Sequence, residues 1–168
     1  MSFEIRGYRP ADDHPACRGL WVELTQAHRG FYDDDSIGGN DPGAEFEEYL
    51  TRLELSGMWV AEDDGEVIGF TGLLVRGRHG EVEPLVVGES VRREGVGTAL
   101  LERVAEEAGR RGLEYLTIQP VTRNIAGLHC FHDAGYTAMS QVTLTKDLAE
   151  RPHEWRDGIE LHGLRFTY

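Results

Sequence analysis

Lysine, cysteine and long hydrophobic runs are all scarce in this sequence. Lys146 is the only lysine, and because it does not belong to a Gly-Lys-Ser/Thr motif, a P-loop for nucleotide binding is excluded. The two cysteines, Cys17 and Cys130, are too few for a disulfide framework. No apolar run approaches membrane-spanning length, and the N-terminus lacks the hydrophobic segment of a signal peptide. We therefore expect a cytoplasmic protein.

Positive charge is scarce as well. The 30 acidic residues outnumber the 17 lysines and arginines, which gives a formal net charge of −13. This excess argues against nucleic acid and anionic membranes as partners. It favours a cationic small molecule or a basic peptide, and the alternative is that it only keeps the protein soluble. A length of 168 residues is enough for one domain with its own hydrophobic core. We predict a single domain over residues 1–168.

A strand followed by a helix, over residues 81–111, organises the chain. The apolar residues of 82–87 are mainly valine, which favours a strand. Between strand and helix lie an arginine pair and Gly95-x-Gly97. The first N–H groups of a helix lack partners within it and attract anions, and glycine lets a phosphate approach them. The loop indicates an anion site, or else a helix start that only packs against the sheet. The apolar positions at helical spacing are Val96, Leu100, Leu101, Val104, Ala105 and Ala108.

The remaining segments predict alternating strands and helices. Residues 63–66 carry a hairpin signal, and Asp41-Pro42 is a typical helix start. The expected order, β-α-α-β-β-β-α-β-α-β-β, indicates an α/β or α+β fold with a mixed sheet. The expected elements are strand 3–9, helix 13–28, a helix from 42 to about 57, strands 58–62, 67–75 and 82–87, helix 96–111, strand 115–119, helix 124–134, and strands 136–146 and 158–168.

Two motifs in this order resemble a known superfamily. The motif Arg92-x-x-Gly95-x-Gly97, after a strand ending Leu-Val-Val, resembles the acetyl-CoA signature of the GNAT N-acetyltransferases. Residues 124–136 are similar to that superfamily's Asn-x-x-Ala…Tyr-x-x-x-Gly-Phe helix. The resemblance covers residues 3–147, most of the chain.

This resemblance implies a fold. The expected GNAT-type sheet is mixed and mostly antiparallel, with about seven strands and flanking helices. Two central parallel strands, 82–87 and 115–119, would splay apart and admit the pantetheine of acetyl-CoA.

The resemblance also implies which residues bind acetyl-CoA. The backbone of the central strand would pair with the pantetheine, and the loop amides and arginines would hold the pyrophosphate. Asn124 has a structural interpretation too, as the cap of its helix. His129-x-x-His132 has no further ligands at suitable spacing, so we predict no metal. The expected cofactor-binding residues are Leu85, Val86, Val87, Arg92, Arg93, Glu94, Gly95, Val96, Gly97, Thr98, Asn124 and Phe131.

Acetyl transfer to an amine requires a group that takes the amine proton, because an alkylamine with a pKa near 10.4 is protonated at pH 7. Glu81 and Glu83 lie two residues apart on the central strand, so we expect both side chains on one face, together with Leu85. The superfamily has a catalytic glutamate at either alignment, and Glu83, nearer the thioester, is our first choice. The alternative is that both form ordinary ion pairs beside the turn at residues 76–78.

Phe131 departs from the superfamily pattern, because many members have there a tyrosine that can protonate the departing thiolate. The resemblance predicts an acetyl-CoA-dependent N-acetyltransferase in which a primary amine of a small molecule or peptide attacks directly in a ternary complex. The alternative is a non-catalytic acyl-CoA-binding or sensing module, which Phe131 favours and the two glutamates oppose. The residues identify neither the acceptor nor the length of the acyl group. The edge strand 159–166 predicts a homodimer.

Overall fold

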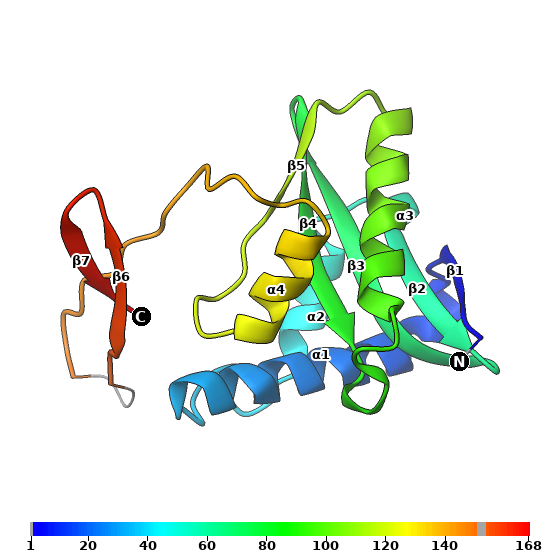
Figure 1. Cartoon of the computed structure of the whole chain (residues 1–168). Coiled ribbons are helices and arrows are strands. Elements are labelled where there is room, and N and C mark those ends of the chain that lie inside the picture. The colour runs from blue at the N-terminus through cyan, green and yellow to red at the C-terminus, as the bar shows by residue number, and fades with distance from the viewer. Residues whose placement is uncertain (1, 151–153) are drawn as a thin grey trace.

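The computed structural model describes residues 2–150 and 154–168, which form a five-stranded sheet with helices on both faces and a separate C-terminal hairpin (Figure 1). The sheet order is β1-β2-β3-β4-β5, and every pair is antiparallel except β4 with β5. The predicted fold class is confirmed. The strands of this sheet are β1 (Glu4–Gly7), β2 (Met58–Asp63), β3 (Glu66–Arg76), β4 (His79–Val87) and β5 (Tyr115–Ile118).

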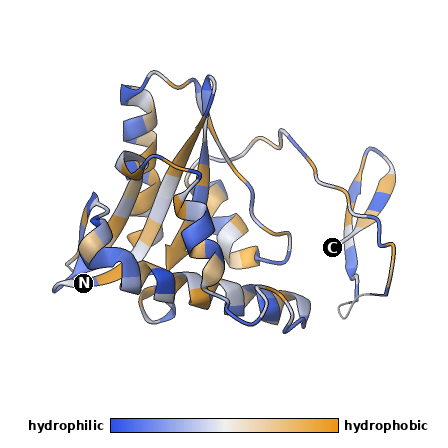
Figure 2. Cartoon of the chain, turned by 180° about the vertical axis from the view of Figure 1, so that it is seen from behind, coloured by the Kyte–Doolittle hydropathy of each residue, from blue (hydrophilic) through white to orange (hydrophobic). Residues whose placement is uncertain are grey.

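The helices divide into two layers, one on each face of the sheet. The aliphatic and aromatic residues of the sheet supply the core of both layers, while charged residues lie on the outer faces of the helices (Figure 2). The first layer contains α1 (Pro10–Tyr32) and α2 (Ala44–Leu50), and the second contains α3 (Val96–Arg110) and α4 (Ile125–Asp133); short 3-10 turns occupy Leu55–Gly57 and Glu89–Val91.

Aromatic side chains dominate the core under α1 and α2. Trp21 lies 5.2 Å from Tyr49 and 5.8 Å from Phe46 between ring centroids. The Tyr49 hydroxyl reaches the backbone of β3, where a Cβ atom on Gly72 would lie only 1.8 Å from it. Glycine in a central strand is therefore required here by close approach.

The helix α3 agrees with its predicted pattern. Its buried residues are Val96, Leu100, Leu101, Val104 and Ala108, all on the predicted apolar face, whereas Ala105 of that predicted face is exposed. Helix α1 instead begins at Pro10, three residues before the predicted start. Asp13 lies inside its first turn and accepts a hydrogen bond from the backbone N–H of Arg9 at 2.7 Å. Helix α2 is shorter than predicted and ends at Leu50.

The C-terminal region differs most from the prediction. Residues 136–146 contain no strand, and the predicted strand 158–168 is a hairpin of β6 (Asp157–Leu161) and β7 (Leu164–Thr167). His162 and Gly163 both have positive φ, at 52° and 76°, as a two-residue hairpin turn requires. The described residues thus contain seven strands, five in one sheet and two in the other, but one predicted strand is missing and another is replaced by two.

Candidate active site

The gap between β4 and β5 is the first feature of the site. The two parallel strands pair only where residues 79–82 face residues 115–118. Beyond Val82, β4 continues to Val87 without a partner on that side, and the chain after β5 turns away toward α4 (Figure 1). The predicted splay of the two central strands is therefore present.

A β-bulge lies at the same place on the other side of β4. Thr71 pairs with Leu85 and Leu73 pairs with Val82, so Glu83 and Pro84 together oppose the single residue Gly72. Proline has no N–H to donate, and within a sheet it is confined to edges and bulges.

The bulge overturns one prediction. Val82, Leu85 and Val87 all pack on the α3 side of the sheet, whereas Val86 packs on the α1 side. Simple alternation would give Val82 and Val86 the same face. Glu83 therefore does not share a face with Leu85, as the sequence interpretation had it. Pro84 was the available signal, since proline within a central strand predicts a bulge.

Glu83 is paired with Arg52, which follows the C-terminal end of α2. The guanidinium donates to both carboxylate oxygens, at 2.7 and 3.3 Å. The side chains of Arg52 and Glu83 are 39% and 32% exposed, so an incoming polar group can reach the pair. The hydrogen bond to Glu83 raises the pKa of Arg52.

Glu81 has two partners of its own. It accepts a hydrogen bond from the Gln119 amide at 2.7 Å and from Arg76 at 3.3 Å. The pair with Arg76 is the one that the alternative interpretation of the sequence expects. Glu81 is the less accessible of the two glutamates, with a side chain that is 15% exposed.

Tyr49 lies one helical turn before Arg52. Its hydroxyl is fully buried and has no hydrogen-bond partner among the described residues. Burial raises the pKa of this phenol, and the negative charge of Glu83 adds to the shift. Tyr49 therefore stays neutral at any physiological pH.

The N-terminus of α3 faces the unpaired end of β4. Gly95 and Arg93 both have positive φ, at 88° and 70°, and no side chain caps the helix. The first intrahelical bond is donated by Ala99 to Gly95, so the three preceding N–H groups are available to an anion. Arg92 donates to the carbonyl oxygen of Val87 at 3.2 Å and ties this loop to β4. Arg92 and Arg93 are both exposed and add positive charge.

Helix α4 closes the site from the other side of the gap. A Cβ atom on Gly97 of α3 would lie 3.6 Å from the Cys130 sulfur of α4 and 3.7 Å from the Val87 side chain. The start of α3, the end of β4 and α4 therefore converge at Gly97. Asn124 caps α4, because its side-chain oxygen accepts from the Gly127 N–H at 2.9 Å.

Phe131 belongs to the core under α3 and α4. It is 8% exposed and packs edge to face against Tyr136, with centroids 6.5 Å apart. Val96 is likewise buried in this core. Because both side chains are buried, Phe131 and Val96 can contact a cofactor only through their backbone groups or through the apolar surface that they support.

Arg123 is a buried charged residue whose role the sequence interpretation missed. It is 8% exposed, and its guanidinium donates to the carbonyl oxygens of Phe31 and Tyr168, both at 2.9 Å, and of Glu154 at 2.5 Å. It also lies over the Tyr32 ring, 4.7 Å from the centroid. Arg123 thus joins the end of α1 to the C-terminal hairpin. Like Arg52, it has partners far away in sequence, which no local pattern reveals.

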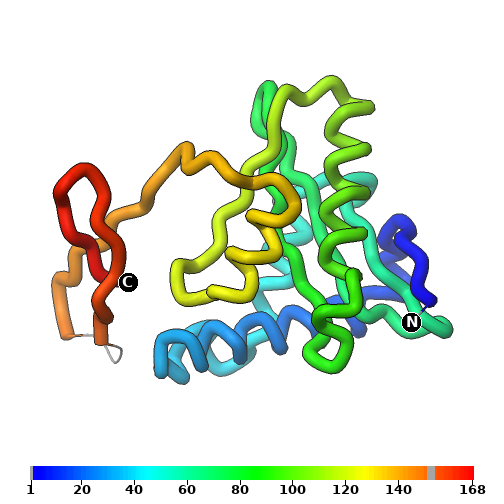
Figure 3. The backbone as a smooth tube through the Cα atoms, viewed as in Figure 1, coloured from blue at the N-terminus to red at the C-terminus, as the bar shows by residue number. Residues whose placement is uncertain are grey.

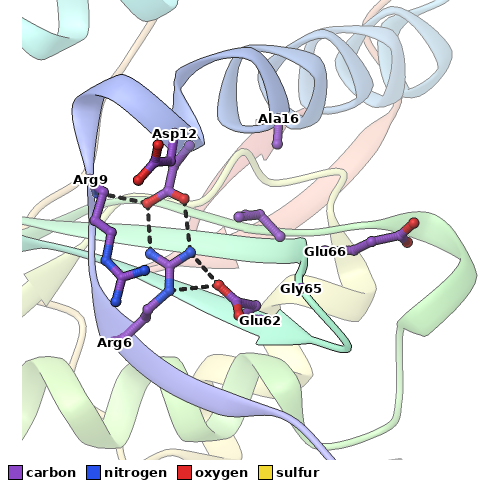
Figure 4. Close-up of a pocket in the computed structure, with 9 residues that line it drawn as sticks. Arg6, Arg9, Asp12, Ala16, Glu62, Gly65 and Glu66 are labelled. Carbon is purple, nitrogen blue, oxygen red and sulfur yellow. Dashed lines mark hydrogen bonds and ion pairs between the residues drawn. The ribbon is translucent and has the colours of Figure 1, made fainter.

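A polar surface hollow lies far from this site, beside the edge strand β1 (Figure 4). Arg6 donates to both oxygens of Asp13, at 2.7 and 2.8 Å, and to Glu62 at 2.7 Å. Arg6, Asp13 and Glu62 pair with one another and form a structural network that joins β1, α1 and β2. Within residues 2–150 and 154–168, no cluster of three or more metal-ligating side chains is found, and no helix combines the length and apolar character needed to cross a membrane.

Solved structures with this fold include several acetyltransferases. PaiA N-acetyltransferase from Thermoplasma acidophilum in complex with coenzyme A is 17% identical, with a TM-score of 0.72 over 84% of this chain and 94% of that chain. AAC(6')-Iy in complex with the bisubstrate analogue CoA-S-monomethyl-acetylneamine is 16% identical, with a TM-score of 0.65 over 89% and 100%. Glucosamine-6-phosphate N-acetyltransferase from Arabidopsis thaliana is 15% identical, with a TM-score of 0.62 over 89% and 100%. At these identities the likeness shows the fold alone.

The sequence itself identifies the family. A comparison with curated proteins finds no match. The Acetyltransferase (GNAT) family matches residues 20–136. This range includes Glu81, Glu83, the loop that precedes α3, and α4. That match spans well over half of the chain, and the chain therefore belongs to the GNAT family of acetyltransferases.

Proposed function

We propose that this protein transfers an acetyl group from acetyl-CoA to a primary amine of a small molecule or peptide, by direct attack in a ternary complex. One observation carries the proposal: the uncapped N-terminus of α3 faces the splayed end of the strand that also bears Glu81 and Glu83. An anion site and an open strand edge on the α3 side of the sheet are thereby joined, through β4, to a carboxylate on the opposite side. The coenzyme A and bisubstrate complexes of the two similar structures support acetyl-CoA as co-substrate.

The loop before α3 and the strand β4 bind different parts of the cofactor. The N–H groups of residues 96–98 hold the pyrophosphate, and the exposed Arg92 and Arg93 neutralise its charge. The unpaired backbone of residues 85–87 hydrogen-bonds the pantetheine as a neighbouring strand would. Acetyl-CoA supplies an acyl group already activated as a thioester.

The acceptor amine must lose a proton before it attacks. At pH 7 this costs roughly 4–5 kcal/mol for an amine with a pKa near 10.4. Glu83 takes the proton, directly or through a water molecule. Arg52 forms an ion pair with Glu83. Because exposed ion pairs contribute only about 0–1 kcal/mol, a cationic acceptor can displace the arginine from this carboxylate. Glu81 is the second candidate for this role.

The departing thiol does not need a strong acid. Its pKa is near that of cysteine, about 8.5, so it leaves readily as a thiolate. Phe131 has no proton to give, and its burial beside Tyr136 is compatible with that. The absence of a tyrosine at this position therefore does not require loss of activity.

Release of free thiol from acetyl-CoA tests the proposal. The wild-type protein and Glu83→Gln are incubated with acetyl-CoA and a panel of primary amines, and thiol formation is followed with a chromogenic disulfide. We expect amine-dependent release that the substitution lowers. If acetyl-CoA raises the melting temperature but no amine elicits thiol release, the protein is an acyl-CoA-binding module instead. The cytoplasmic location stays a prediction from the sequence.

A further inference from the structure

The ion pair between Arg52 and Glu83 has unused hydrogen-bonding capacity on both sides. A guanidinium has five N–H donors, and among the described residues Arg52 uses them only in its two bonds to Glu83. A carboxylate can accept about four hydrogen bonds, and within the same described chain Arg52 is the only side-chain or backbone donor to the Glu83 carboxylate. Both side chains are partly exposed. Each end of the pair can therefore bind a further polar group.

The other arginine–carboxylate clusters of the sheet are more completely satisfied. Arg6 donates to two different carboxylates, and its side chain is 13% exposed. Glu81 accepts from the Gln119 amide as well as from an arginine, and its side chain is 15% exposed. The pair of Arg52 and Glu83 differs from both, because it is accessible and incompletely used.

The guanidinium of Arg52 is supported by Tyr49. Its central carbon lies 5.7 Å from the centroid of the Tyr49 ring, and the backbone N–H of Arg52 donates to the Tyr49 carbonyl oxygen at 2.9 Å. Tyr49 itself is fully buried and packs against Trp21. Because an aromatic face attracts a cation, the guanidinium keeps this support when Glu83 binds another partner.

The two charges reach one place from distant parts of the chain. Arg52 follows α2 and Glu83 lies on β4, 31 residues further on, in the cyan and green parts of the tube in Figure 3. A plain alkylammonium is a poor ligand for this pair, because it displaces the guanidinium from Glu83 and two like charges then lie close together. The other carboxylate that acts on the charge of Arg52 is Glu48, which makes no hydrogen bond to it in the described part of the chain.

An acceptor that carries a carboxylate beside its amine removes this conflict. Its ammonium pairs with Glu83, and its carboxylate pairs with the displaced guanidinium, whose planar fork of N–H groups matches a carboxylate in two parallel hydrogen bonds. All four charges then have an opposite neighbour. A phosphate is a poorer match, since it carries a charge of about −1.5 to −2 at pH 7 and would face both Glu48 and Glu83.

We propose that the acceptor is a free α-amino acid, with its ammonium bound by Glu83 and its carboxylate bound by Arg52. The inference rests on the proposed function, in which Glu83 takes the proton of the amine. It narrows the acceptor from any primary amine to one whose amine and carboxylate are one carbon apart.

The transfer changes the charge of the ligand. Glu83 takes one proton of the ammonium, the nitrogen forms a bond to the acetyl carbon, and the carbon–sulfur bond of acetyl-CoA breaks. The second proton that the nitrogen loses ends on the leaving thiolate. The product, an N-acetyl amino acid, has a carboxylate but no cation for Glu83. Once Glu83 has given its proton to solvent, it pairs with Arg52 again, and the restored ion pair favours release of the product.

Matched acceptors test the role of the carboxylate. Amino acids and their carboxamides are compared by thiol release from acetyl-CoA, because the carboxamide keeps the amine and the side chain and lacks the anion. We expect kcat/KM of the preferred amino acid to exceed that of its carboxamide about 10- to 100-fold, as hydrogen bonds to a charged group contribute. The carboxamide has the less basic amine, so a preference for the acid arises from the protein. Arg52→Gln should bring the ratio close to one.

Arg78→Gln is the matched control. Arg78 is likewise an exposed arginine paired with a glutamate, Glu114, so its loss changes the net charge by the same amount. This variant should keep the wild-type ratio, and Arg52→Lys should keep part of it. If carboxamides react as fast as amino acids in the wild type, or if Arg52→Gln retains the preference, the inference is wrong. A preference for O-phosphoethanolamine over every amino acid also overturns it.

A binding measurement separates this inference from the proposed function. With coenzyme A in place of acetyl-CoA no transfer occurs, and the melting temperature reports binding of the acceptor alone. An amino acid should raise it, its carboxamide should not, and Arg52→Gln should remove the shift. If this shift appears while no amine releases thiol, the amino acid site stands and the enzymatic proposal fails. If amines without a carboxylate release thiol and no amino acid shifts the melting temperature, the enzymatic proposal stands and the inference is wrong.

Discussion

Two arginine–carboxylate clusters lie on this sheet, and they differ in how deeply they are buried. Arg6 and Asp13 have side chains that are 13% and 2% exposed, whereas Arg52 and Glu83 are 39% and 32% exposed. In the first cluster Arg6 donates to both carboxylate oxygens of Asp13, and the backbone N–H of Arg9 donates to one of them as well. In the second, solvent and ligands can compete for Glu83. The same pair of residue types is thus closed to solvent in the first cluster and accessible to a ligand in the second.

Removal of Asp13 should have the largest effect. Asp13→Ala leaves Arg6 without its bidentate partner and the Arg9 N–H without an acceptor, and breaking a buried pair costs about 3–5 kcal/mol. Urea denaturation measures the loss. Asp12→Ala, on an exposed neighbour in the same turn, is the matched control and should change stability by less than about 0.5 kcal/mol. Equal losses in both variants would show that helix charge, rather than the sealed pair, is responsible.

The same residue predicts how stability depends on pH. Burial alone would raise the pKa of Asp13, but the hydrogen bonds from Arg6 and from the Arg9 backbone outweigh it and lower the pKa. A carboxyl with a lowered pKa stabilises fully above its unfolded value, about 3.9, and the gain is lost as the pH falls through the folded value. Urea midpoints of wild type and Asp13→Ala should therefore converge below about pH 3.9. Parallel curves down to the acid limit would contradict this.

Removal of Glu83 should act on rate rather than on stability. Glu83→Gln is expected to lower kcat about 10²-fold or more near neutral pH, the usual contribution of a general base. The deficit should shrink as the pH approaches the pKa of the amine, because the substrate then arrives neutral. Its urea midpoint should stay near that of the wild type, since exposed ion pairs contribute little. If Glu81→Gln is slow and Glu83→Gln is not, the base is Glu81.

Introducing a carboxylate at the start of α3 tests the cofactor site. Gly97→Asp brings negative charge and bulk to the point where α3, β4 and α4 converge, so acetyl-CoA should no longer raise the melting temperature. Gly97→Ala is the control, because its Cβ would make only ordinary contacts of 3.6–3.8 Å. It should retain the shift. Loss of the shift in both variants, or in neither, would move the cofactor site away from Gly97.

Restoring a tyrosine should have the smallest effect. Phe131→Tyr adds a hydroxyl to a side chain that is 8% exposed, and the thiolate leaves without help because its pKa is only about 8.5. We expect kcat to change by less than about threefold, or about 0.6 kcal/mol. A large gain in rate would show that proton delivery limits the enzyme.

Local patterns predicted much of this molecule. Helical spacing located α3, and hairpin and cap signals located β2, β3 and α4, because each depends on residues close in sequence. The bulge at Pro84 was missed because alternation was carried through a residue that cannot join a ladder. The turn at His162-Gly163 was missed because a single strand was carried through two residues that have positive φ. Arg52 and Arg123 were beyond reach, because their partners lie 31 residues or more away.

The segment after α4 shows a different limit. Residues 136–146 have the preference of a strand, and yet they form none, because a strand also needs a neighbour at the right distance. Sequence patterns report the preference of a segment and say nothing about its partner.

The close approach of Tyr49 to Gly72 means that substitutions in α2, β3 and β4 depend on one another. Any side chain at position 72 would meet the Tyr49 hydroxyl at 1.8 Å and the Glu83 carbonyl oxygen at 2.8 Å. A larger residue there is tolerated only after Tyr49 is shortened and the bulge is rebuilt, so the order of substitutions matters. The helix α2 and the strand that bears Glu83 must therefore diversify together. Substitutions of Tyr49 in α2 should be selected with position 72 randomised in the same library.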